Sequence, residues 1–196
     1  MNNFAATVPV KEVVSGAGIP KARHHRTAHP LIAHAQLQFD ELHGLVARLE
    51  QGDYTAPVPV LSNASIGQHM RHILEFYICL MEAQNGTVDY DARKRDKSLE
   101  NERSATLAKL GALRAWAEGL DADARLTLIA DHSYDGSSRE RMATSLFREL
   151  AYAFDHAIHH MALLRIGIAQ QHADIVLDPN FGVAPSTIRD RLKCVR

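Results

Sequence analysis

The stretch TSLFRELAYAFDHAIHHMALLRIGIAQQ, residues Thr144–Gln171, is the longest and most regular helical pattern in the chain. At about 100° per residue, its apolar side chains gather within about 40° of one direction on a helical wheel. These side chains are Leu146, Leu150, Ala153, Ala157, Leu164 and Ile168. A helix with one apolar stripe buries that stripe against other elements. The stretch therefore predicts a long helix packed on its neighbours.

Two helices are expected in the first half of the chain. Pro30–Gln51 has apolar residues at helical spacing, and Gly52 is a suitable C-terminal stop. Residues 53–62 contain two prolines and are expected to form a loop. The next helix is expected to begin near Ser62–Ser65, where Ser or Asn can cap free backbone N–H groups, and to end near Asn85-Gly86.

Another helix is expected over Glu102–Glu118, where leucines repeat every three residues and Gly119 follows. The run RLTLIA (Arg125–Ala130) has β character and Asp135-Gly136 is a turn signal, so a short β-hairpin is expected before the long helix. A short terminal helix capped at Ser186 is expected at the end. Four long helices with one β excursion predict a mainly all-α fold, an up-and-down or related four-helix bundle.

The length of 196 residues suits one domain with tails. Residues 1–29 show no clean periodicity and are expected to form a flexible N-terminal tail, followed by a single helical-bundle domain over residues 30–196. The formal net charge of -1 gives no electrostatic footprint for nucleic acid, and no basic helix points to a membrane surface. We expect a small-molecule substrate and a homodimer, since long amphipathic helices often leave a second apolar face.

The features that bear on location are the N-terminus, the apolar runs and the cysteines. The N-terminus lacks the basic start and sustained apolar segment of a signal peptide. No apolar run approaches the roughly 20 residues that span a bilayer. Cys79 and Cys194 do not make a disulfide framework, and a reducing compartment fits them. These features predict a cytoplasmic protein.

Histidine is unusually frequent, with 12 in the chain. On the long helix, His156 and His160 lie four residues apart, so both imidazoles fall on one face and can reach one metal ion. On the wheel, His160 falls about 40° and His156 about 80° from the apolar direction, whereas His159 falls about 140° away, toward solvent or a neighbour. The alternative is that these are ordinary surface or core histidines.

A third ligand is expected from the helix that precedes Asn85-Gly86, where His69 and His72 are three residues apart. The apolar face of that helix lies nearer to His69, so the spacing alone slightly favours His69. Three neutral imidazoles leave an open coordination position, which is typical of catalytic rather than structural metal sites. We expect Zn²⁺ or Ni²⁺, but a ligand set without cysteine or carboxylate does not separate these ions from Co²⁺ or Mn²⁺.

Two histidine motifs and one C-terminal segment form a combined pattern. The first motif begins at Ser65 and reaches His72-Ile73-Leu74-Glu75 seven residues later. The second has the form H-x-x-H-H over His156–His160, with Met161-Ala162 after it. The segment FGVAPSTIR spans Phe181–Arg189. In these features the chain resembles the DinB family, which includes YfiT-like metal-dependent hydrolases.

The resemblance implies a four-helix bundle of the DinB/YfiT type with a metal site at His72, His156 and His160. The chain departs from the pattern at His69, where the family has an apolar residue, so His69 is a candidate fourth inner group or rival ligand. Many members have Asn before the second motif, where this chain has Asp155. Relatives include thiol-dependent transferases or isomerases and metal-dependent hydrolases, and a shared fold does not fix the reaction.

Two functions are open. A metal-dependent enzyme would activate water for hydrolysis, or a low-molecular-weight thiol such as glutathione for transfer to an electrophile. His69 would then be a catalytic base or hydrogen-bond donor, and family analogy favours thiol transfer. A non-catalytic metal-binding or dimerising module would have a closed coordination sphere, or no metal, and no pocket beside the histidines. Cys79 is expected to pack in the core.

Overall fold

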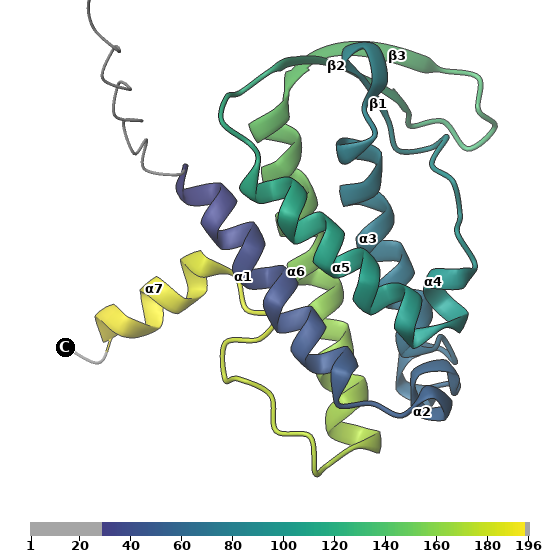
Figure 1. The fold of residues 1–196 in the computed structure, drawn as a ribbon, viewed down its shortest axis with the longest axis vertical. Helices are drawn as coiled ribbons and strands as arrows, with labels where there is room; N and C mark the ends of the chain where they lie inside the picture. The colour runs from purple at the N-terminus through teal and green to yellow at the C-terminus, as the bar shows by residue number, and fades with distance from the viewer. Residues whose placement is uncertain (1–28, 195–196) are drawn as a thin grey trace, which may run out of the picture.

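The computed structural model describes residues 29–194, so the expected N-terminal tail lies outside the described residues except for His29. Over this range the chain forms helices and a small sheet (Figure 1). The α-helices are α1 (Pro30–Ala47), α2 (Gln51–Thr55), α3 (Ile66–Met81), α4 (Ser98–Asn101), α5 (Arg103–Glu118), α6 (Leu146–Gln171) and α7 (Pro185–Cys194). The 3₁₀ helices and strands are η1 (Pro59–Leu61), η2 (Gln84–Gly86), β1 (Thr87–Asp89), β2 (Arg125–Asp131) and β3 (Arg139–Ser145).

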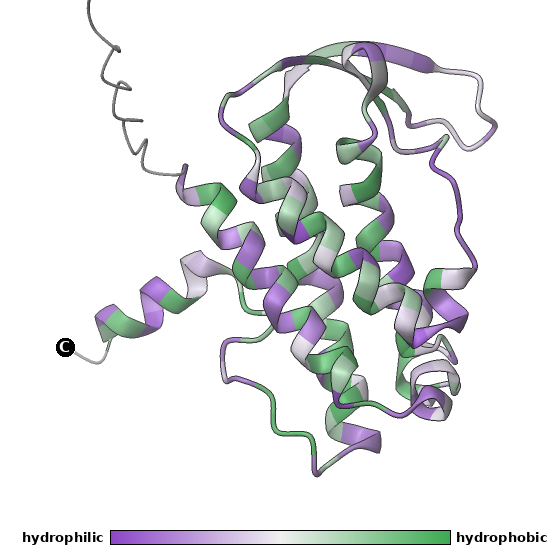
Figure 2. Ribbon diagram, viewed as in Figure 1, coloured by the Kyte–Doolittle hydropathy of each residue, from purple (hydrophilic) through white to green (hydrophobic). Residues whose placement is uncertain are grey.

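The long helices α1, α3, α5 and α6 pack around a shared core. α5 lies against α1 and α3, and α6 lies against α3 and α1. Each of these helices carries both apolar and polar residues (Figure 2). The buried side chains include Phe39, Leu42, Met70, Ile73, Leu110, Leu113, Leu150 and Leu164. The predicted mainly helical fold is confirmed, and its assignment to the DinB type stays a prediction.

No helix within residues 29–194 has the length and apolar character that a membrane crossing requires.

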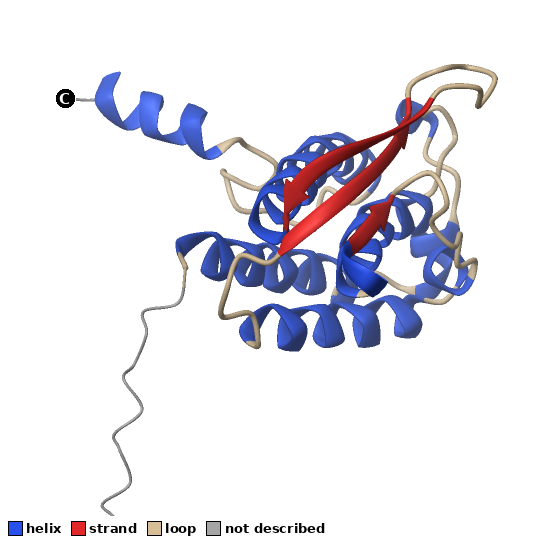
Figure 3. Ribbon diagram, turned by 90° about the horizontal axis from the view of Figure 1, so that it is seen from above, coloured by secondary structure: helices blue, strands red, loops and turns tan. Residues whose placement is uncertain are grey.

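The three strands form a sheet in the order β1-β2-β3, which lies across one end of α3 and α6 (Figures 1 and 3). β2 and β3 pair antiparallel, with Leu128 opposite Met142, and the loop between them contains Asp135-Gly136. The predicted hairpin is therefore confirmed. β1 pairs parallel with β2, with Val88 opposite Leu128. No pattern in the sequence marks β1, because three residues are too few to show alternation.

The first helix is shorter than predicted, and Gly52 does not end it. α1 ends at Ala47, and Gly52 lies within α2, with no atom near the place of a Cβ. The predicted loop over residues 53–62 is also wrong, since it contains the end of α2 and all of η1. Tyr54 is fully buried and its hydroxyl donates to the carbonyl oxygen of Leu99 at 2.6 Å. Burial of this ring stabilises a short helix that the local glycines and prolines do not reveal.

Two other helix ends differ from the prediction. α3 ends at Met81 rather than near Asn85-Gly86, which instead turns the chain toward β1. Asn85 and Gly86 both adopt left-handed backbone, with φ of 54° and 70°. α7 begins at Pro185, so Ser186 lies inside the helix and does not cap it. Proline is favourable in the first turn because its missing N–H would have no helical partner.

The predicted start of α3 is confirmed. The hydroxyl oxygen of Ser65 accepts from the backbone N–H of Gln68 at 3.1 Å, and Oε1 of Gln68 accepts from the N–H of Ser65 at 3.0 Å. This reciprocal capping box fixes the first turn. In the same turn, Gly67 allows close packing on α4, since a Cβ there would meet the carbonyl oxygen of Glu100 at 2.1 Å. These contacts position the helix that carries His69 and His72.

Candidate metal centre

The clustered histidines come from two neighbouring helices. α3 carries His72, and α6, which packs beside it, carries His156 and His160 one turn apart. α6 begins with Ser145 as its cap, whose hydroxyl oxygen accepts from the N–H of Arg148 at 3.3 Å. Its buried face consists of Glu149, Leu150, Ala153, Ala157, Met161, Leu164, Gly167 and Ile168. Burial of that face leaves the two histidines on a flank directed at α3.

His72, His156 and His160 lie close enough to bind one metal ion. One ring nitrogen from each can be chosen so that all three lie within 4.8 Å of one another. The ring centroid of His72 is 5.0 Å from that of His156 and 4.6 Å from that of His160. These are the residues to which the family resemblance assigns the metal. His159 is exposed, as the helical wheel predicts.

His69 adjoins this group without belonging to it. Its Nδ1 lies 3.2 Å from Nδ1 of His160, but the compact set of three nitrogens does not include it. The helical wheel favoured His69 as the α3 ligand, whereas the geometry favours His72. The difference arises because both rings lie on the partly buried flank of α3, and the position of α6 selects between them.

The protonation of the three rings suits a metal ligand set. Burial is the largest cause that lowers the pKa of His72 to about 4 and that of His160 to about 3, and the neighbouring imidazoles lower both further. The pKa of His156 is lowered by burial and then by His159. Neutral imidazoles offer a lone pair at neutral pH. Nε2 of His156 is buried without a hydrogen-bond partner, which is costly unless a ligand occupies it. The residues therefore fit a divalent cation.

Among the described residues, no cysteine or carboxylate joins this group. Cys79 is partly buried and packs against the core, as expected. Burial is the main cause that raises the pKa of its thiol to about 11. The thiol is therefore protonated at neutral pH and is a poor nucleophile.

An open, shallow cavity of about 330 Å³ adjoins the histidines. His69, His72 and His160 line it, together with Ala64, Gln68 and Arg71. Two of the three candidate ligands thus face a space that a small molecule can enter. An accessible ligand set with room for a further ligand is the arrangement of catalytic metal sites.

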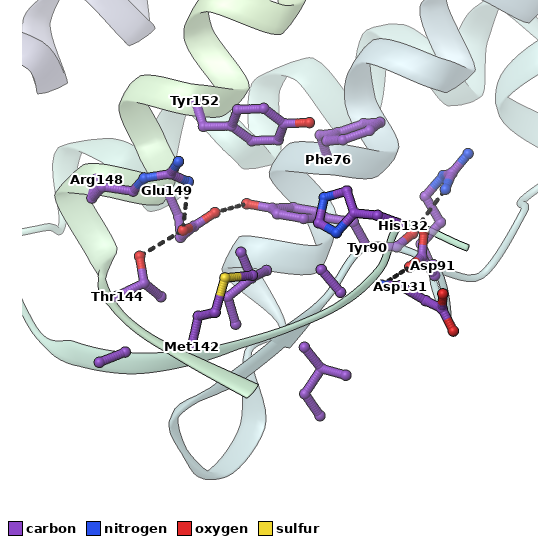
Figure 4. A pocket seen from close by; sticks show the side chains of 15 residues that line it. Phe76, Tyr90, Asp91, Asp131, His132, Met142, Thr144, Arg148, Glu149 and Tyr152 are labelled. Atoms are coloured by element: carbon purple, nitrogen blue, oxygen red, sulfur yellow. Dashed lines mark hydrogen bonds and ion pairs between the residues drawn. The ribbon is translucent and has the colours of Figure 1, made fainter. Parts of the chain in front are cut away.

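A second cavity of about 500 Å³, here called the slot, lies between the sheet and the helices α3 and α6 (Figure 4). Phe76 and Tyr152 form its helical side, and Met142 lies on the sheet side. The ring centroid of Phe76 lies 4.0 Å from that of His156, and the ring centroid of Tyr152 lies 6.1 Å from that of His156. The slot therefore begins next to the histidine cluster.

A buried carboxylate closes one end of the slot. Glu149 is fully buried and accepts hydrogen bonds from Tyr90 Oη at 2.8 Å, Thr144 Oγ1 at 2.6 Å and Arg148 Nη1 at 2.9 Å (Figure 4). No motif in the sequence marks these four residues as a group. The one available signal was Glu149 on the apolar stripe of the long helix, next to Leu150, where a carboxylate requires partners.

Neither a protein-family model, nor a curated protein, nor a solved structure matches this chain.

Proposed function

We propose that the protein is a metal-dependent enzyme that holds one divalent ion, Zn²⁺ or Ni²⁺, on His72, His156 and His160 and converts a small molecule. When bound, the ion would supply Lewis acidity that lowers the pKa of a thiol or of water toward neutrality. We place transfer of a low-molecular-weight thiol such as glutathione ahead of hydrolysis, on the DinB resemblance alone.

The observation that carries the proposal is the cavity beside His72 and His160. A structural metal site is closed by four protein ligands, whereas a catalytic site keeps a position for substrate. Here the compact group has three imidazoles, and two of them border open space. This supports an enzyme over the alternative, a non-catalytic module with a closed coordination sphere.

The remaining residues would serve binding and positioning. His69 contacts His160 through Nδ1, so we assign it a role in orienting that ring rather than in ligation. The slot would hold the electrophile, because its aromatic walls Phe76 and Tyr152 begin beside His156 and suit an apolar body.

The nucleophile would come from outside the chain. The Cys79 thiol stays protonated at neutral pH, because burial raises its pKa to about 11. Cys79 and Cys194 are both free, which suits the reducing cytoplasm that we propose as the location.

The first experiment is the metal content of the purified, untagged full chain, measured by elemental mass spectrometry. We expect a near-stoichiometric divalent metal in the wild type and its loss in the His156→Ala/His160→Ala variant. His159→Ala is the matched control, since this exposed histidine lies on the same helix and should leave the metal in place. Turnover of glutathione with a model aryl halide, and of ester substrates, would then be compared across the same proteins.

Two outcomes would overturn the proposal. If the wild type takes up no metal after loading with Zn²⁺, Ni²⁺ and Mn²⁺, the histidines are structural. If it holds metal that neither thiols nor small anions can reach, the non-catalytic module is correct.

A further inference from the structure

Arg71 precedes His72 on α3 and lines the same open cavity as the histidines. Its ion pairs are made by Nε, which lies 3.0 Å from Oε2 of Glu100 and 3.8 Å from Oε1 of Glu75. The contact with Glu100 has ion-pair distance without hydrogen-bond geometry. Within residues 29–194, neither Nη1 nor Nη2 of Arg71 donates a hydrogen bond, and the guanidinium atom that pairs with each carboxylate is Nε. The two carboxylates thus hold one edge of the guanidinium and leave its terminal amino groups for a ligand.

The charge around Arg71 is not fully balanced. Glu75 and Glu100 are buried, and each also pairs with a second cation. Arg93 Nε lies 3.2 Å from Oε2 of Glu75, and Lys97 Nζ lies 2.7 Å from Oε1 of Glu100. Three basic side chains therefore share two carboxylates in this network. This excess of positive charge borders the histidines, because Arg71 lines the same cavity as His69, His72 and His160. A positive potential in a cleft attracts anions.

The cavity lining has donors for an anion and no competing acid. Its residues are Ala64, Gln68, His69, Arg71, His72 and His160, with no aspartate or glutamate among them. Oε1 of Gln68 is used in the capping box with Ser65, which leaves the amide NH₂ as a further donor. A guanidinium edge matches the two oxygens of a carboxylate.

We infer that the small molecule bound at the histidine cavity carries a carboxylate, and that Arg71 binds it. The inference rests on the proposed function for the reaction at the histidines, but the anion contact itself needs only Arg71 and the cavity. Arg71 is then a specificity-determining residue, which selects an acid over its neutral analogue.

The first test compares two thiols on the Co²⁺-loaded full chain, with binding followed by the thiolate-to-cobalt charge-transfer absorption. The probes are 3-mercaptopropionate and its neutral analogue 3-mercaptopropionamide. We expect the wild type to bind the acid at least about tenfold more tightly, as a charge-assisted bidentate contact allows. Equal affinity for the two thiols in the wild type would overturn the inference.

The variant for this test is Arg71→Gln/Glu100→Gln, which removes both members of the closer ion pair and leaves no buried carboxylate of that pair without its cation. It should lose the preference for the acid and keep its affinity for the amide. Glu100→Gln alone is one control. Arg114→Gln, which removes the same charge at an exposed pair with Asp40, is the other. A preference that survives in the double variant would show that the carboxylate binds elsewhere, which contradicts the role of Arg71.

A second test needs no metal and separates this inference from the proposed function. NMR spectra of the metal-free wild type are recorded during titration with propionate and with propionamide. Propionate should shift the Arg71 Nε–Hε resonance in a saturable way, and propionamide should not. If Co²⁺ fails to bind, the proposed function fails, and this titration still decides the role of Arg71. No shift with propionate, together with no preference between the thiols, would refute the carboxylate site.

Discussion

Nδ1 of His69 lies 3.2 Å from Nδ1 of His160, so the two rings share a hydrogen bond in which one of these nitrogens carries the proton. A neutral imidazole has one N–H and one acceptor. When His160 donates, its Nε2 keeps the lone pair that a metal requires. When His160 accepts, Nε2 carries the proton and cannot bind. His69 therefore favours metal binding when it acts as the acceptor, as the partners of metal-bound histidines commonly do.

We expect His69→Leu to weaken metal binding by about 10- to 100-fold, since loss of such a partner frees the ring and its tautomer. His69→Gln keeps an acceptor oxygen and should recover most of the affinity. Competition with a chromophoric chelator measures both constants, with circular dichroism to check the fold. If the Leu and Gln variants bind metal equally well, the hydrogen bond does not orient His160.

Metal-free protein should lose stability in acid as the histidine cluster charges. The folded-state pKa values of His72, about 4, and His160, about 3, lie below the ordinary value of 6.5. At pH values between 6.5 and these folded-state pKa values, the unfolded chain binds protons that the folded chain excludes. The free energy of unfolding therefore falls as pH falls. The contribution of these rings is complete above pH 6.5 and is lost toward their folded pKa values. Each ring adds a slope of at most about 1.4 kcal/mol per pH unit, reduced by its contact with solvent.

His72→Gln tests this dependence. Urea denaturation of the metal-free variant should show a shallower decline than the wild type between pH 6.5 and 4. Above pH 7.5 the two curves should run parallel, which serves as the internal control. Parallel curves through the acid range would mean that His72 titrates alike in the folded and unfolded chain.

The helical core and the histidine cluster were predictable from the sequence because they depend on local periodicity. The i, i+4 spacing places His156 and His160 on one flank of α6 whatever that helix packs on. The choice between His69 and His72 was different, because it depends on where α6 lies against α3. The family motif, and not the helical wheel, named the ring that the structure includes in the compact set.

The features that the sequence did not reveal all depend on contacts between distant segments. The hydrogen bond from Tyr54 to the carbonyl oxygen of Leu99 helps to stabilise α2. The parallel pairing of β1 with β2 joins segments about 40 residues apart. The slot requires this sheet as its second wall, so its residues carry no shared signature along the chain. Arg71 gains its role from Glu100, which approaches α3 only because position 67 is glycine.

Gly67→Ala tests that approach. A Cβ at this position would meet the backbone oxygen of Glu100 at 2.1 Å and the Tyr54 ring at 2.8 Å, so α3 and α4 would have to separate. We expect a loss of about 1–3 kcal/mol in the free energy of unfolding, typical of overpacking. Gly111→Ala, on the open side of α5, should instead stabilise by about 0.5–1 kcal/mol through helix propensity. Urea denaturation of both variants at neutral pH makes the comparison, and a neutral Gly67→Ala would show that the helices can move apart at little cost.

Glu149→Ala should be among the most damaging single changes near the slot. The fully buried carboxylate accepts from Tyr90, Thr144 and Arg148, and so ties β3 and the segment after β1 to α6. Its removal leaves the buried Tyr90 hydroxyl without an acceptor, and we expect a loss of about 2–4 kcal/mol. Tyr90→Phe removes only one of the three hydrogen bonds to Glu149 and should cost about 1 kcal/mol.

The Glu149→Ala/Tyr90→Phe double variant tests whether the two side chains act together. It lacks the Tyr90 hydroxyl, so an unmet hydrogen bond of that hydroxyl cannot add to the cost. The combined loss in thermal or urea denaturation should therefore be smaller than the sum of the two single losses. An additive result would mean that the two side chains stabilise the fold independently.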